Sequence, residues 1–411
     1  MFFPDLVVRS RRTVLPAAIR PAALHIRHGK IIGVMDFDDV PDGCPMDDAA
    51  TSVLMPGAVD THVHVTDGFE TTTRAAAAGG VTTIVVMPSQ AGPPTRQPSW
   101  GAKPGAGSPM RAAGGTCFVD VGFWGGIDPG NVAGLDALAA DGVLGFTCNV
   151  AADIRPALPV VAKLGLPLLV HAVLPGPIER AAAAARASRG WVSRLVGAAP
   201  NSNKYATYLA AHPKEAENEA IALAIDLCRT FRVRMHILHL SSSDALTPLY
   251  HARASRLPIS AETCPHYLTV VAEEIPDGAT AFLCDPPIRE RENREYLWAS
   301  LAGGLIQMVV SDHPHVSSLQ VGLAATWTEA KARGYTLNQL VDWMCRAPAR
   351  LAGFERKGAI EVGFDADLTI CNPDAAESAL VEQTYLRGAR IYERGKPMGT
   401  PTGQLLECRS A

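Results

Sequence analysis

Eight apolar, β-rich runs recur along the middle of the chain. They occupy residues 52–65, 81–87, 117–124, 142–148, 166–171, 234–239, 257–262 and 306–311. Most of these runs are nearly continuous in Val, Ile and Leu instead of alternating with polar residues. Such continuity is typical of parallel strands that are buried on both faces. The pattern therefore predicts eight parallel strands.

Helical patterns lie between several of these runs. Residues 214–231 place small and apolar side chains at helical spacing, and residues 70–78, 291–302, 322–333 and 336–351 also predict helices. Strands that alternate with helices over about 300 residues predict an α/β fold of the (β/α)8 TIM-barrel type. The rival is a doubly wound open sheet, but no glycine-rich phosphate-binding motif follows any of the runs.

The two ends of the chain share a pattern of short predicted strands that differs from the pattern of the middle. Short strands are predicted at residues 5–8, 23–26 and 30–35, and again at residues 363–370 and 383–392. We therefore predict a small composite β-domain made of residues 1–56 and 357–411, and a barrel domain at 57–356. Proline and glycine crowd residues 92–113, which predicts a loop there in place of a helix.

Composition and charge narrow the class of protein. The 411 residues carry a net charge of -4 without a basic block, so neither nucleic acid nor an anionic membrane is an expected partner. The nine cysteines are scattered and form no C-x-x-C motif, which indicates reduced thiols. No convincing signal peptide or membrane-length apolar stretch is present. The expected location is the cytoplasm.

Histidines stand at the ends of several runs. His62 and His64 are two residues apart, so in an extended strand they point to the same side. His171, His239 and Asp312 end or directly follow three other runs. In a barrel, all strand carboxyl ends meet at one face. Any single histidine here could be an ordinary strand-end residue that is hydrogen-bonded to a neighbour. Four histidines and one aspartate at one face, however, favour a metal site of the zinc type.

The chain also resembles a known family. Its motifs are similar to those of the amidohydrolase superfamily, in the branch of dihydroorotases, dihydropyrimidinases and allantoinases, and most closely to allantoinases. The resemblance rests on residues 56–64, 68–83, 120–126, 212–221, 239–243, 262–268, 284–289, 310–313 and 356–368.

This resemblance implies a site with two zinc ions. His62, His64 and Asp312 would hold one ion, and His171 with His239 the other. A hydroxide between the ions would attack the ring carbonyl of a cyclic ureide, converting allantoin to allantoate in purine catabolism. Asp312 would act as general base and then as general acid. The partners implied are a small-molecule ureide substrate and other copies of the chain, in a homotetramer.

The sequence departs from the family at Thr147, where relatives carry a carboxylated lysine that bridges the two metals. Loops after His64 and after Asp312 are also shorter than in the family. Three interpretations stay open. The chain works with one ion; another carboxylate, Asp153 or Asp67, replaces the bridge; or the chain is a catalytically impaired scaffold relative. The alternative substrates are those of dihydropyrimidinases, hydantoinases and dihydroorotases.

Overall fold

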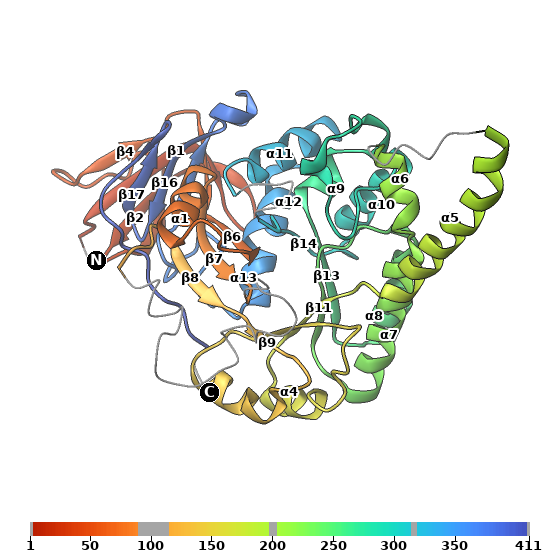
Figure 1. The fold of residues 1–411 in the computed structure, drawn as a ribbon. Coiled ribbons are helices and arrows are strands. Elements are labelled where there is room, and N and C mark those ends of the chain that lie inside the picture. The colour runs from red at the N-terminus through yellow and green to blue at the C-terminus, as the bar shows by residue number, and fades with distance from the viewer. Residues whose placement is uncertain (1–2, 89–114, 197–203, 314–318, 409–411) are drawn as a thin grey trace. The chain divides into compact units, whose positions relative to one another are not determined.

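The computed structural model describes residues 3–88, 115–196, 204–313 and 319–408 (Figure 1). The chain forms two compact units, which are described separately below. Unit 1 comprises Met1–Gly125, Ala140–Leu144 and Met308–Ala411, and unit 2 comprises Gly126–Ala139 and Gly145–Gln307. The predicted domain boundaries at residues 56 and 357 stay a prediction. The predicted loop at 92–113 lies outside the described residues.

Unit 1 contains a nine-stranded sheet built from both ends of the chain. Its order is β18-β17-β16-β15-β5-β1-β2-β3, and β4 pairs with β1. The central pair joins the two ends, because Leu54 of β5 lies opposite Ile370 of β15 in antiparallel register. In Figure 1 the red strands and the blue strands accordingly lie side by side. The strands are β1 (Leu6–Val14), β2 (Ile19–Arg27), β3 (Lys30–Met35), β4 (Met46–Asp48), β5 (Val53–Pro56), β15 (Leu368–Cys371), β16 (Val381–Leu386), β17 (Ala389–Glu393) and β18 (Lys396–Pro397).

A second, parallel sheet of unit 1 follows directly in the chain. It has the order β6 (Ala58–Val63), β7 (Val81–Val86) and β8 (Asp120–Phe123), with α1 (Phe69–Ala78) between the first two strands. The chain passes from β5 into β6 at Gly57, where a Cβ atom would lie 2.3 Å from the Thr82 side chain. Glycine is therefore the residue that fits at this crossing without displacing Thr82.

The remaining elements of unit 1 follow residue 307. They are β14 (Met308–Val309), α11 (Gly322–Ala332), α12 (Leu337–Val341) and α13 (Ala347–Leu351). A π-helical turn at Asp342–Arg346 separates the last two helices. The single helix predicted at 336–351 is therefore continuous in position but changes its hydrogen-bond pattern in the middle.

Unit 2 is built on four parallel strands. They are β10 (Phe146–Asn149), β11 (Leu168–His171), β12 (Met235–Ile237) and β13 (Ile259–Thr263), paired in chain order. The unit also contains α4 (Leu158–Leu164), α5 (Pro175–Val196), α6 (Tyr205–Ala211), α7 (Glu215–Phe231), α8 (Leu246–Ala254), α9 (Pro265–Thr269) and α10 (Arg291–Ala302). The short β9 (Gly125–Gly126) and α3 (Leu135–Ala140) lie at the borders of the units. In the described part of the chain, we find no helix with the length and apolar character needed to cross a membrane.

A buried ion network holds the two sheets of unit 1 together. The Lys357 ammonium lies 2.7 Å from Asp120 at the start of β8 and 2.6 Å from Asp367 just before β15. Arg387 donates to Asp120 through its guanidinium and to Asp367 through its backbone N–H. Burial lowers the pKa of Lys357, but Asp367 and Asp120 more than offset this and raise it. The lysine is therefore a permanent cation that balances two buried carboxylates.

We predict that Lys357→Met destabilises the protein by about 3–5 kcal/mol, because removing one partner leaves buried carboxylates uncompensated. Urea unfolding followed by circular dichroism measures the change. The matched control is Lys331→Met, since Lys331 pairs with Asp374 at 2.6 Å in a largely exposed position. The control should lose less than about 1 kcal/mol. Equal losses in the two variants would contradict a structural role for the buried network.

Candidate metal centre

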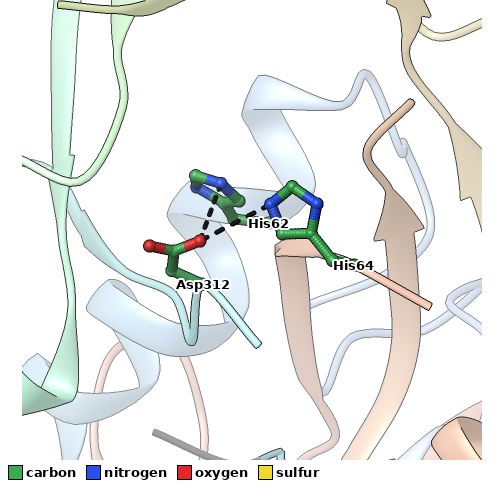
Figure 2. A group of neighbouring side chains, drawn as sticks. All are labelled: His62, His64 and Asp312. Atoms are coloured by element: carbon green, nitrogen blue, oxygen red, sulfur yellow. Dashed lines mark ion pairs between the residues drawn. The ribbon is translucent and has the colours of Figure 1, made fainter. Parts of the chain in front are cut away.

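His62, His64 and Asp312 form a compact cluster within unit 1. His62 belongs to β6 and His64 directly follows that strand, while Asp312 lies three residues beyond β14. The Nε2 atoms of His62 and His64 lie 3.1 and 3.6 Å from Oδ1 of Asp312. Figure 2 shows both imidazole rings turned toward the Asp312 carboxylate. The predicted orientation of the histidine pair is thus confirmed.

The spacing of these atoms fits a metal ion. In a tetrahedral site with bonds of about 2.0–2.2 Å, neighbouring ligand atoms lie about 3.3–3.6 Å apart. The three donor atoms lie within 4.8 Å of one another, and His62 and Asp312 are buried. Two imidazole nitrogens and one carboxylate oxygen are a donor set that zinc accepts, with one position left for water. The residues present therefore fit one such ion.

A buried carboxylate lies behind this cluster. Asp60 accepts the backbone N–H of His62 at Oδ1 (3.1 Å) and that of Ser311 at Oδ2 (3.0 Å). Burial raises the pKa of Asp60 to about 6, although these hydrogen bonds oppose the rise. The segment that contains Ser311 also binds His64, because the backbone N–H of His64 donates to the His313 carbonyl at 2.7 Å. Both segments of the cluster are therefore connected through the backbone.

His171 and His239 form a second pair, within unit 2. His171 ends β11 and His239 follows β12 by two residues. Nδ1 of His171 lies 2.8 Å from Nε2 of His239, and the two rings meet edge to face. Glu262 of β13 supports this pair, since its Oε1 accepts the His239 N–H at 3.3 Å. Its other oxygen lies 3.0 Å from Nε2 of the fully buried His236.

Thr147 lies on β10, which continues one residue beyond the end predicted for that run. In the parallel pairing of β10 with β11, Thr147 is opposite Leu169, and Asn149 is opposite His171. Asn149 is exposed, and its side-chain oxygen accepts the N–H of Ala151 at 2.9 Å. The residue in register with His171 is thus a neutral amide, and the buried Thr147 carries a neutral hydroxyl.

The segment after His239 is attached to α7. Both oxygens of Glu217 accept backbone N–H groups, from Ser241 and Ser242, at 2.8 Å each. Burial raises the pKa of this carboxyl to about 7, against the nearby Arg289 and the two donors, which lower it. The loop that carries His239 is therefore held by a helix of the same unit.

A second loop of unit 2 is held by hydroxyl groups. This loop comprises residues 284–288 and contains two prolines and an exposed aspartate, Asp285. Four hydroxyls donate to backbone carbonyls of this segment at 2.6–3.0 Å: Tyr208 to Cys284, Tyr267 to Pro286, Ser241 to Pro287 and Tyr205 to Ile288. Ser241 thus connects this loop to the segment that follows His239.

Sequence reasoning identified the histidines and Asp312, and the structure brings them together as one triad and one pair. That the two clusters share a binuclear centre stays a prediction. The two carboxylates named as substitutes for the bridge, Asp67 and Asp153, are exposed. Sequence reasoning missed Asp60, Glu217 and Glu262. A signal existed for Asp60 and Glu262, because each is a lone acidic residue inside an apolar run.

Comparison with known proteins places the chain in a family. The amidohydrolase family model matches residues 145–391. The chain is 38% identical to an allantoinase of Streptomyces avermitilis over 98% of both proteins. It is 32% identical to an allantoinase of Arabidopsis thaliana, over 97% of this chain and 90% of that protein. The bacterial alignment spans 459 positions against 411 residues here, so the relative carries segments that this chain lacks.

Solved structures of similar fold include the L-hydantoinase (dihydropyrimidinase) from Arthrobacter aurescens. It matches with a TM-score of 0.83 and 24% identity over the whole of both chains. A dihydropyrimidinase from Brevibacillus agri matches with a TM-score of 0.81 and 23% identity, over 97% of this chain and 98% of that one. These likenesses show the fold, an α/β barrel of the TIM type with a small β-domain. Together with the relatives in sequence, they show that this chain belongs to the amidohydrolase family and is a hydrolase of cyclic amides.

Proposed function

We propose that this chain hydrolyses the cyclic amide of allantoin to allantoate, as a step of purine catabolism. The observation that carries the proposal is the cluster of His62, His64 and Asp312, whose donor atoms have the spacing of a zinc site. The relatives support the substrate, because allantoinases of a bacterium, a plant and a yeast match at 31–38% identity along nearly the whole chain.

His62, His64 and Asp312 would hold the ion. A bound zinc ion lowers the pKa of water and polarises a carbonyl group. The Asp312 carboxylate then takes a proton from the attacking water and delivers it to the ring nitrogen that leaves the opened amide. The water oxygen becomes part of the new carboxyl group, which releases the second water proton to solvent as it ionises to the carboxylate, and the nitrogen leaves as a neutral ureido N–H.

We propose one essential ion, held by the triad, because Thr147 cannot supply a bridging anion. The family would place a second ion on His171 and His239. These two imidazoles are neutral ligands, so a dication held by them alone would keep its full charge. Burying that charge without a compensating anion costs free energy. The triad differs, since it contributes a carboxylate and leaves a fourth position for water.

Three further features belong to the same proposal. Zinc is favoured by the mixed nitrogen and oxygen donors. A reducing compartment such as the cytoplasm is supported by the nine cysteines, which are thiols. A homotetramer follows from the family resemblance.

The first test combines metal content with turnover. After reconstitution with Zn²⁺ or Co²⁺, the purified chain should hold about one ion and consume allantoin. Asp312→Asn should reduce turnover by roughly 100-fold or more, because it removes both the negative charge of the ligand and the proton acceptor. His28→Ala is the control, since His28 is exposed in a turn of the nine-stranded sheet. A chain that binds no metal and shows no turnover would contradict the proposal and favour a scaffold role. Faster turnover of hydantoin or dihydrouracil would favour the alternative substrates.

The second test restores the missing family residue. Thr147→Lys, assayed with bicarbonate present, should raise bound metal from about one to about two ions per chain and should raise allantoin turnover. Thr147→Met is the matched control, because it adds similar length without an amine that carbon dioxide can carboxylate. Identical behaviour of the two variants would show that loss of the lysine is not what limits the second site.

A further inference from the structure

Backbone conformation singles out two of the proposed ligands. Eight non-glycine residues in the described part of the chain have positive φ: His28, Ala50, Arg232, His239, Arg256, Asp312, Arg387 and Arg394. Only His239 (φ 35°) and Asp312 (φ 52°) among them are buried. The other six lie in exposed or partly exposed places, where turns accept this conformation at little cost.

A left-handed conformation at Asp312 needs support from its surroundings. It is disfavoured for an L-residue, and such outliers persist only where neighbouring contacts determine them. Asp312 directly follows Ser311, whose N–H donates to Oδ2 of Asp60 at 3.0 Å. The Ser311 hydroxyl bonds to the same carboxylate. Asp60 therefore holds the backbone immediately before the strained residue.

The same carboxylate also holds the histidine side of the cluster. Its Oδ1 accepts the N–H of His62 at 3.1 Å. One buried side chain thus uses its two oxygens to bind two segments that are about 250 residues apart in sequence, and each segment contributes a ligand. The backbones of His62 and of Ser311, the residue before Asp312, are thereby held at the two oxygens of one carboxylate.

We propose that Asp60 is a positioning residue that sets the metal affinity of the triad by fixing His62 and Asp312 relative to each other. This inference rests on the proposed metal binding by the triad. A carboxylate is required because both of its oxygens accept hydrogen bonds. An asparagine would turn its NH₂ group toward one of the two backbone N–H donors, and that donor would lose its acceptor in a buried place.

The test is metal affinity in Asp60→Asn, measured by competition with a chelating dye on the full chain. We expect Zn²⁺ to bind about 10–100-fold more weakly than to the wild type, as when a residue that orients a metal ligand is lost. The visible absorption of bound Co²⁺ should change as well, because it depends on ligand geometry. Ser311→Ala retains the backbone N–H and should weaken binding only about 2–10-fold, which provides a milder variant if Asp60→Asn folds poorly.

The matched control is Asp367→Asn. Asp367 is also a buried carboxylate of unit 1 that accepts a backbone N–H, that of Arg387 at 2.8 Å, but it bonds to no residue of the triad. It should lower the melting temperature and leave Zn²⁺ affinity within about 2-fold. Equal Zn²⁺ affinity in wild type, Asp60→Asn and Ser311→Ala would overturn this inference alone. Absence of binding in the wild type would overturn the proposed function, and this inference with it.

Discussion

The hydrogen bonds accepted by the Asp60 carboxylate connect the parts of unit 1 on which the candidate metal centre depends. β6 enters the parallel sheet at Gly57, where the side chain of Thr82 leaves no room for a Cβ atom. Five residues later the strand presents His62, and Asp60 ties that residue to the segment after β14. A ligand pair from distant parts of the sequence is thereby set by backbone contacts and not by the flexible side chains alone. Preorganisation of this kind reduces the entropy that metal binding must overcome.

Buried charge is handled differently at the two ends of this sheet. At the start of β8, Asp120 and Asp367 are neutralised by Lys357 and Arg387, which is a stable arrangement that leaves no capacity for a ligand. Near the end of β6, Asp312 is bordered by two histidines and Asp60 by backbone N–H groups. The local charge near the end of β6 therefore favours binding of a cation there. The sheet thus has a structural end and a chemically receptive end, as barrel strands commonly do.

The sequence predicted the strands and the positions of the candidate ligands better than the contacts that support them. All eight apolar runs contain strands, because continuous Val, Ile and Leu reports burial on both faces. His62, His64 and Asp312 were predictable since the strand ends of a barrel share one face. α5 was not predicted, although its central run of alanines favours a helix. Asp60 and Glu262 were missed because sequence periodicity cannot tell which backbone N–H groups a buried acid will meet. The left-handed backbone at Asp312 has no sequence signal, as aspartate adopts many conformations.

Charge also explains why Thr147, in place of the family lysine, is expected to affect metal binding at the two histidine clusters unequally. The triad carries its own carboxylate, so a dication bound there retains about one positive charge, which the protein dipoles and water can solvate. His171 and His239 are 2.8 Å apart and contribute no anion. On β10, the residue opposite His171 is the neutral Asn149, and Thr147, opposite Leu169, is neutral as well. The Glu262 carboxylate is occupied by the His239 N–H and by His236. A metal at this pair depends on an anion supplied from elsewhere, whereas a metal at the triad does not. Under the proposed function, loss of the family lysine would therefore act on the second ion, and the residues proposed for the proton transfer would remain complete in unit 1.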